Sequence, residues 1–267
     1  MNIIGQNKLL SKIDTYHTMK SLPKTLMFIG QAGCGKHTVA KYLASIFEFN
    51  YVEINENVSV SDLNEYLYST IDTLYVIDLA KFTEKQQHSF LKIIEEPTKS
   101  MYFVLLTTSE AGVLNTILNR CIKYNFEQYT KDQIEQITNT SVSELAFNIF
   151  QTPGKLLNLT ETSFQNIIDL SANLVQNIGR ASYANTLVIS TKINYKDLYN
   201  KIDFNLFLDA VEYLAFEDYK NNLTEQSFIV YRITNQFKQY ATKTNLIKET
   251  LMLNYLTTLW EAVHDVN

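Results

Sequence analysis

The chain has 267 residues, of which 46% are hydrophobic and 19% charged, and its formal net charge is −5. This balance is that of an ordinary globular protein and argues against wholesale disorder, and the length allows one to three domains. The negative net charge excludes a protein that binds nucleic acid over its whole surface, so any contact with DNA is expected to be local. Other proteins are therefore the more expected partners.

Cysteine content and hydropathy argue against a disulfide-rich, zinc-binding or membrane-spanning protein. Cys34 and Cys121 are the only cysteines, too few for a disulfide framework or a four-ligand zinc site. No stretch approaches the roughly 20 apolar residues of a membrane span. We therefore expect a cytoplasmic protein with reduced thiols, no zinc and no membrane partner.

The first half of the chain alternates short apolar segments with helical patterns. Thr83 and Gln86 can form a capping box, and Pro97 ends the helix that they begin. The pattern predicts strands at 25–29, 51–54, 73–78, 101–107 and 121–126, with helices at 39–47, 62–70 and 83–96. Strands separated by helices predict an α/β fold whose parallel sheet is covered on both faces.

From about residue 129 the strand signals largely stop. Helices are predicted at 130–138, 142–150, 154–160, 164–178, 182–191, 195–199, 204–219, 224–242 and 245–263. The predicted organisation is an α/β domain over 1–127, a small helical domain over 128–162 and an all-α domain over 163–267.

Residues Gly30–Thr38, here called the phosphate loop, match the pattern G-x-x-x-x-G-K-[ST] except at one position. Gly30, Gly35 and Lys36 fit the pattern, with Gly33 as a further glycine. A loop between a strand and a helix points backbone N–H groups at one place, and the helix N-terminus adds partial positive charge. The loop therefore predicts binding of a nucleotide phosphate; the alternative is a glycine-rich turn with an incidental lysine.

The mismatch falls where a hydroxyl should bind Mg²⁺. His37 occupies that position, and imidazole is a poor ligand for a hard cation. Thr38 comes one residue late, about 100° around the helix. We expect a nucleotide site of ATP or ADP type in which Mg²⁺ is poorly held.

The run 74–81 occupies the place of the second nucleotide motif. Asp78 ends an apolar strand and is a candidate Mg²⁺ ligand; the alternative is an acid that merely ends a strand. Leu79 stands where many ATPases have a glutamate that polarises the attacking water, and leucine cannot do so. The sequence predicts very slow hydrolysis.

Arg120 ends a short predicted helix just before the last strand. A helix-terminal arginine is often a solvated residue that complements the helix dipole. Presented on the surface, it can also reach the ATP of a neighbouring subunit and stabilise charge on the γ-phosphoryl group.

Together these residues resemble the AAA+ clamp-loader family. The similar segments, which include Ile3–Gln6 and cover about residues 1–160, also comprise the phosphate loop, Val76–Asp78, Phe90–Pro97, Leu106–Ser109 and Thr116–Cys121. The last of these and Phe90–Pro97 are the most specific, and the likeness is greatest to clamp-loader subunits of the bacterial DNA polymerase III delta-prime type.

The resemblance implies an AAA+ domain with a five-stranded parallel sheet, a helical lid and a C-terminal collar. It implies that Arg120 is a trans-acting arginine finger, with Asn119 a departure from the family motif. It puts a polar sensor residue at Thr107 or Thr108 and a lid arginine near Gly154, where this chain has none. Nucleotide binding is expected to be weak or absent.

The implied partners are the other subunits of a hetero-pentamer, a sliding clamp and primed DNA. In that arrangement the chain would be a stator that lends Arg120 to its neighbour. Two alternatives remain open: a motor subunit that hydrolyses ATP itself, and a P-loop nucleotide-binding switch outside replication.

Overall fold

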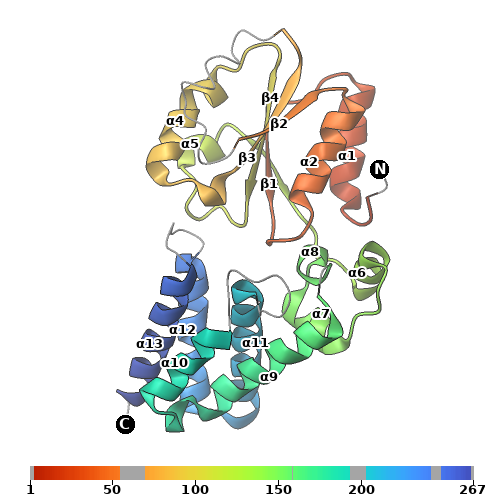
Figure 1. Cartoon of the computed structure of the whole chain (residues 1–267). Helices are drawn as coiled ribbons and strands as arrows, with labels where there is room; N and C mark the ends of the chain where they lie inside the picture. Colours follow the sequence, from red (N-terminus) through yellow and green to blue (C-terminus); the bar gives the residue numbers. More distant parts are fainter. Residues whose placement is uncertain (1–2, 55–69, 158, 193–202, 242–247, 266–267) are drawn as a thin grey trace. The chain divides into compact units, whose positions relative to one another are not determined.

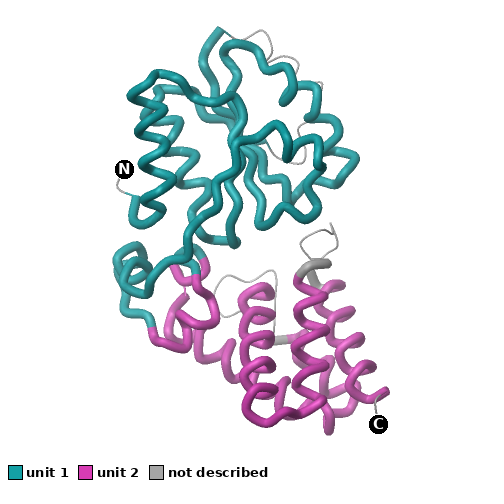
Figure 2. Tube along the Cα trace, turned by 180° about the vertical axis from the view of Figure 1, so that it is seen from behind, with its two compact units in different colours: residues 1–142, 152–154 teal, residues 143–151, 155–267 magenta. Residues whose placement is uncertain are grey.

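The computed structural model describes residues 3–54, 70–157, 159–192, 203–241 and 248–265. The chain divides into two compact units (Figure 2): unit 1 holds residues 1–142 and 152–154, and unit 2 holds 143–151 and 155–267. The predicted helices at 62–70 and 195–199 lie outside the described residues.

Unit 1 is built on one sheet. Within the described residues its five strands are all parallel, in the order β2-β3-β4-β1-β5. The strands are β1 (Thr25–Ile29), β2 (Asn50–Ile54), β3 (Thr73–Asp78), β4 (Met101–Thr107) and β5 (Ile122–Asn125). These bounds confirm the predicted α/β fold with a five-stranded parallel sheet.

Helices cover both faces of this sheet (Figure 1). α1 (Asn7–Thr18) and α2 (Lys36–Ile46) lie on one face, and α4 (Glu84–Glu95) and α5 (Asn115–Leu118) lie on the other. Side chains alternate between the two faces, so a central strand must be apolar throughout.

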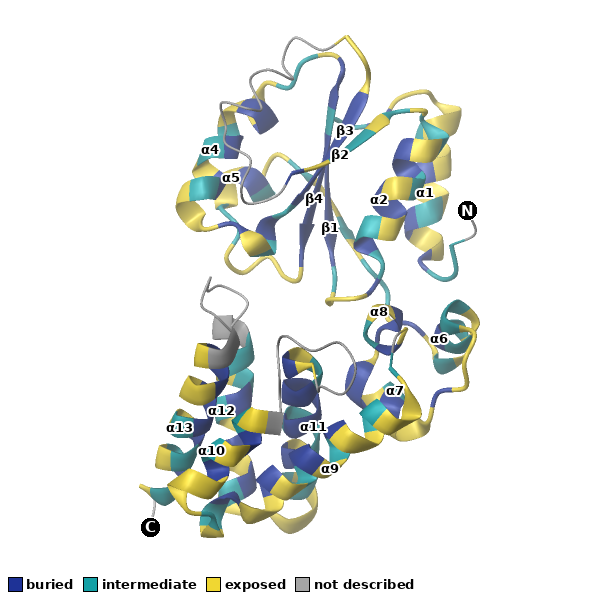
Figure 3. Ribbon diagram, viewed as in Figure 1, coloured by how far each residue is buried: buried dark blue, intermediate teal, exposed yellow. Residues whose placement is uncertain are grey.

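Strand β4 illustrates this requirement. Phe103 and Leu105 belong to the core cluster under α4 and α5, whereas Val104 and Leu106 belong to the cluster under α1 and α2. All four are buried, and the central strands β1, β3 and β4 are the most continuously buried part of unit 1 (Figure 3).

Two local features of unit 1 differ from the sequence prediction. α1 was not predicted, and it buries only Leu9 and Ile13 along a largely polar sequence. A single 3-10 turn, η1 (Leu79–Lys81), separates β3 from α4. The capping box of α4 is confirmed: Thr83 accepts from the N–H of Gln86, whose side chain accepts from the N–H of Thr83.

The remaining described elements are helical. α6 (Lys131–Thr138) belongs to unit 1, and Thr130 caps it in a second capping box. Unit 2 contains α7 (Glu144–Phe150), α9 (Glu161–Asn177), η2 (Ile178–Arg180), α10 (Tyr183–Lys192), α11 (Phe204–Asn222), α12 (Glu225–Ala241) and α13 (Lys248–His264).

In unit 2, α11 packs against α7, α9 and α12, while α13 packs against α10 and α12. α8 (Pro153–Leu156) is shorter than the predicted helix at 154–160. The two units divide between residues 142 and 155. The predicted limits of the three domains, at 127/128 and 162/163, are not tested by this division and stay a prediction. None of the helices in the described part of the chain is long and apolar enough to cross a bilayer.

Candidate nucleotide site and arginine corner

The candidate site lies at the carboxyl edge of the sheet. Ile29, the last residue of β1, pairs with Thr107, and Asp78, the last residue of β3, pairs with Leu106. The phosphate loop follows β1 directly, so the fold brings it to the same edge as Asp78 and Thr107. Ligands of open α/β sheets bind at this edge.

The phosphate loop turns into α2 through glycines with left-handed backbone. Gly33 has φ 79° and Gly35, the N-cap of α2, has φ 91°. No side chain caps this helix end. This helix end can therefore meet a ligand, and the helix dipole favours an anion there.

Protein donors hold the five successive carbonyls from Gly30 to Cys34. Three of these bonds come from residues distant in sequence: the Thr152 hydroxyl donates to the Ala32 carbonyl (2.9 Å), the Gly154 N–H to the Gly33 carbonyl (2.9 Å) and the Tyr129 hydroxyl to the Cys34 carbonyl (2.9 Å). The other two carbonyls accept from Lys36. Protein contacts thus hold the backbone of the loop along its length.

Lys36 is only 9% exposed and lies folded onto its own loop. Its Nζ is 2.5 Å from the Gly30 carbonyl and 2.9 Å from the Gln31 carbonyl. Burial lowers the pKa of Lys36, and the charges of Cys34 and Asp78 oppose that effect. To meet an outer phosphate, the ammonium has to exchange these carbonyls for phosphate oxygens.

His37 is engaged away from any metal role. Its Nδ1 lies 3.5 Å from Glu53 Oε1, an oxygen that also accepts from the Tyr51 hydroxyl (2.6 Å) and lies 3.7 Å from Lys41 Nζ. The next residue, Thr38, is exposed on α2. No hydroxyl therefore stands at the position that follows the loop lysine.

Asp78 is also engaged locally. Its Oδ1 accepts from the N–H of Ala80 at 3.3 Å, and its Oδ2 lies 3.8 Å from Lys81 Nζ. Leu79 is 2% exposed and belongs to the core cluster of α4. With His37 in place of the hydroxyl, these residues do not fit the Mg²⁺ site of a P-loop ATPase, and position 79 offers no group to polarise water.

The resemblance implies a polar sensor residue at Thr107 or Thr108 and a lid position, the second sensor, near Gly154. Thr107 is buried and its hydroxyl donates to the Ser109 carbonyl at 2.6 Å, whereas Thr108 is exposed. At the second sensor, a Cβ on residue 154 would lie 2.7 Å from Gly33 Cα. Gly154 is thus required by the close approach of two backbones, and no arginine fits there.

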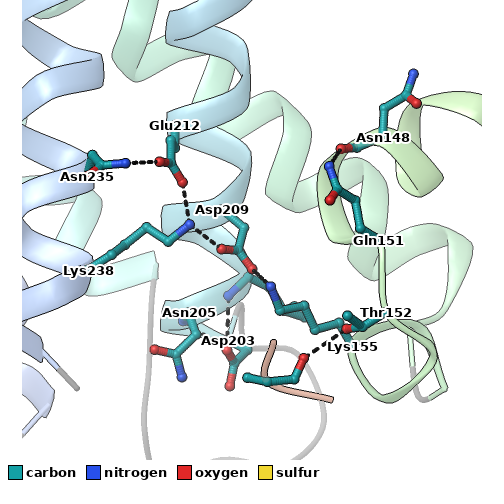
Figure 4. Close-up of polar contacts among 12 residues, drawn as sticks. Asn148, Gln151, Thr152, Lys155, Asp203, Asn205, Asp209, Glu212, Asn235 and Lys238 are labelled. Atoms are coloured by element: carbon teal, nitrogen blue, oxygen red, sulfur yellow. Dashed lines mark hydrogen bonds and ion pairs between the residues drawn. The ribbon is translucent and has the colours of Figure 1, made fainter. Parts of the chain in front are cut away.

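Lys155 follows Gly154 but belongs to a cluster in unit 2 (Figure 4). Its Nζ lies 2.8 Å from Asp209 Oδ2, an ion pair that lacks hydrogen-bond angles, and Lys238 Nζ lies 2.6 Å from Asp209 Oδ1. Lys238 also pairs with Glu212, which accepts from Asn235 at 2.6 Å. Lys155 is thus held by Asp209 on α11.

Arg120 lies just beyond the end of α5, at what we call the arginine corner (Glu95, Thr116 and Arg120). Its Nη1 donates to the Thr116 carbonyl at 2.8 Å, and its Nη2 lies 2.9 Å from Glu95 Oε1. The side chain remains 39% exposed. Only three of the chain's 23 lysines and arginines are arginines, and Arg120 is the sole arginine before Arg180.

Sequence reasoning missed the residues that support the loop and the arginine. Tyr129 and Thr152 hold the phosphate loop, and Glu95 holds Arg120. Gln6, quoted only as part of a similar segment, is 2% exposed and exchanges two hydrogen bonds of 2.8 Å with the backbone of Glu127. Spacing could not reveal these contacts, because each joins segments that are far apart along the chain.

Comparisons with known proteins relate this chain to subunits of DNA polymerase III. The family profile described as DNA polymerase III, delta subunit, matches residues 53–130. The DNA polymerase III gamma subunit of Buchnera aphidicola subsp. Baizongia pistaciae is 22% identical over 225 residues, covering 71% of this chain and 60% of that protein. The delta' subunit of the same organism is 34% identical over 71 residues, covering 26% of this chain and 21% of that protein.

This chain spans 60% or less of the length of these relatives. Among solved structures, a DNA polymerase III gamma subunit-related protein from Thermotoga maritima aligns with a TM-score of 0.53 at 15% identity, covering 94% of this chain and 99% of that one. The Thermotoga maritima RuvB Holliday junction branch migration motor aligns with a TM-score of 0.50 at 15% identity, covering 81% and 76%. At such identity these structures support the fold alone.

Proposed function

We propose that this chain is a clamp-loader subunit of the AAA+ family and acts as a delta-prime-like stator, since the relatives that it resembles are subunits of DNA polymerase III. In this role it does not hydrolyse ATP efficiently. It presents Arg120 to the ATP of a neighbouring subunit and helps to load a sliding clamp onto primed DNA.

The observation that carries the proposal is the contrast between Leu79 and Arg120. Leu79 is buried at the position where a carboxylate would activate water, so position 79 supplies no general base. Arg120 is half-exposed and its guanidinium is held in a defined orientation. The carboxylate that would activate water is replaced by leucine, whereas the arginine that would stabilise the transition state is exposed.

In the proposed mechanism the two sites act separately. The phosphate loop binds ATP or ADP weakly through the N–H groups of α2 and through Lys36, which first has to leave the Gly30 and Gln31 carbonyls. The Arg120 guanidinium stabilises the charge that develops on the γ-phosphoryl group of the neighbour's ATP.

The proposed partners follow from the same role. They are the other subunits of a hetero-pentameric clamp loader, associated through the helices of unit 2, together with the sliding clamp and primed DNA. We expect the complex to be cytoplasmic, in line with the cysteine content and hydropathy of this chain.

Replacing the arginine tests the proposal. In the assembled complex, Arg120→Ala is expected to lower DNA-stimulated ATP hydrolysis by about 10³–10⁵, the range of other arginine fingers, while the complex still assembles. Lys123→Ala, which removes a nearby cation, is the matched control and is expected to leave hydrolysis unchanged. Hydrolysis at the wild-type rate in Arg120→Ala would show that the finger assignment is wrong.

A further inference from the structure

Two protein groups hold the Arg120 guanidinium at two different nitrogens. Nη1 donates to the Thr116 carbonyl at 2.8 Å, and Nη2 lies 2.9 Å from Glu95 Oε1. The Thr116 contact is local, one helical turn before the arginine. The Glu95 contact comes from another helix and fixes the direction that the guanidinium faces.

Glu95 has a defined position because its helix is fixed at several points. It is the last residue of α4, which buries Phe90, Ile93 and Ile94 in the core of unit 1. On the same helix the buried Gln87 donates to the Gly112 carbonyl at 3.0 Å and accepts from the Leu114 N–H at 3.2 Å. Those bonds tie α4 to the segment that leads into α5, and hence to Arg120.

Stability alone does not account for this pair. Both side chains are more than one third exposed, at 39% for Arg120 and 38% for Glu95. Ion pairs this exposed shift the folding equilibrium by about fivefold or less, because water and salt screen them. A long arginine side chain that must meet a phosphate gains more from the contact, because the contact removes rotamer freedom before binding.

The contact also leaves donors for a ligand. A guanidinium has five N–H groups, and the two contacts leave up to three for oxygens of a phosphate. A carboxylate beside the guanidinium therefore orients it without using up its hydrogen-bonding capacity.

We propose that Glu95 is the positioning residue of Arg120, which it holds in the orientation that meets the γ-phosphate of a neighbouring subunit. This inference rests on the proposed function. It also has an electrostatic consequence: the charge of Glu95 weakens the attraction of the guanidinium for phosphate, while its oxygen supplies the orientation. A glutamine at position 95 would have an uncharged acceptor oxygen, so it would keep the orienting contact without weakening the attraction for phosphate.

The test measures ATP hydrolysis by the assembled complex for five variants. Glu95→Ala is expected to lower kcat by about tenfold with little change in the KM for ATP, because preorganisation is lost mainly in the transition state. Glu95→Gln, which keeps an acceptor oxygen, is expected to restore the wild-type rate or exceed it. Glu96→Ala makes the same change in net charge one residue away and is expected to have no effect.

Non-additivity separates positioning from a general structural role. In the Arg120→Ala background, Glu95→Ala is expected to cause no further loss, since the residue that it orients is gone. Additive losses, an unchanged rate in Glu95→Ala, or a faster one would each overturn the inference. If Arg120→Ala itself is harmless, the proposed function fails instead, so the two failures are distinguishable.

A measurement on the isolated chain completes the test. With three arginines in the sequence, the side-chain N–H signals of Arg120 can be resolved by NMR and assigned with Arg120→Lys. Glu95→Ala is expected to shift the Arg120 signal and to speed its exchange with water, whereas Glu95→Gln keeps it near its wild-type position. An Arg120 signal identical in wild type and Glu95→Ala would contradict the proposed contact.

Discussion

The ion pairs of Asp209 and of Arg120 differ in burial and therefore in what they can do. Asp209 is 6% exposed and lies between two lysines in unit 2, whereas Arg120 and Glu95 lie near the surface of unit 1. Removing one partner of a buried ion pair leaves an uncompensated charge inside the protein, and this lowers the free energy of unfolding. An exposed pair contributes little to stability, so its orientation is free to serve a reaction.

The strongest effect on stability is expected at the buried cluster. Asp209→Ala leaves Lys155 and Lys238 without their shared carboxylate, and we expect the free energy of unfolding to fall by about 3 kcal/mol. This is the low end for buried pairs, because both lysines keep some contact with water. Urea denaturation followed by circular dichroism measures the loss.

The control for that experiment is an exposed pair on α11. Glu217→Ala removes the partner of Lys220, 2.8 Å away, and is expected to leave the urea midpoint unchanged. Equal losses in Asp209→Ala and Glu217→Ala would mean that burial does not set the difference between the two kinds of pair.

The next effect concerns the helix that carries Glu95. Thr83→Ala removes the N-cap of α4 and is expected to lower the free energy of unfolding by about 1 kcal/mol. Thr83→Ser keeps the capping oxygen and is expected to retain most of the stability. A Thr83→Ser protein as unstable as Thr83→Ala would show that the cap is not the cause.

The arginine corner is expected to matter little for stability. Arg120→Ala and Glu95→Ala should each change the free energy of unfolding by about 0.5 kcal/mol or less, because the pair is exposed. The same urea titration measures both variants. A loss comparable to that of Asp209→Ala would make the corner a structural feature and erase the contrast with unit 2.

The smallest effect is dependent on pH. The hydrogen bond from Tyr51 lowers the pKa of Glu53 below its ordinary value of 4.5, with His37 and Lys41 adding to the effect. A depressed carboxyl pKa stabilises the fold above that value and loses its contribution as pH falls through the folded pKa. Tyr51→Phe is therefore expected to cost less than about 0.5 kcal/mol at pH 7, and this cost is expected to shrink as pH falls through the folded pKa of Glu53. A cost independent of pH would contradict this assignment.

The sheet and most helices could be predicted because their signals are local. Each central strand is apolar on both faces, and Thr83 and Gln86 are three residues apart, so periodicity and spacing are enough. α1 escaped prediction because it buries few residues, and η1 because a single turn carries no period.

The contacts that decide the site could not be predicted in the same way. Lys155 follows Gly154, the position at which the resemblance puts a lid arginine, yet it is held by Asp209, 54 residues further along the chain. Glu95 lies 25 residues before Arg120 and Tyr129 lies 95 residues after Cys34. Such pairs are set by packing of helices on the sheet, which a residue pattern does not contain.

Phosphate release by the isolated chain distinguishes a protein that lends an arginine, and hydrolyses little ATP itself, from a self-sufficient ATPase. With ATP and Mg²⁺ in excess, we expect no turnover above about 10⁻³ per second, a rate like that of a P-loop protein lacking its finger. Magnesium-dependent turnover of about 1 per second or faster, typical of a working enzyme, would contradict it.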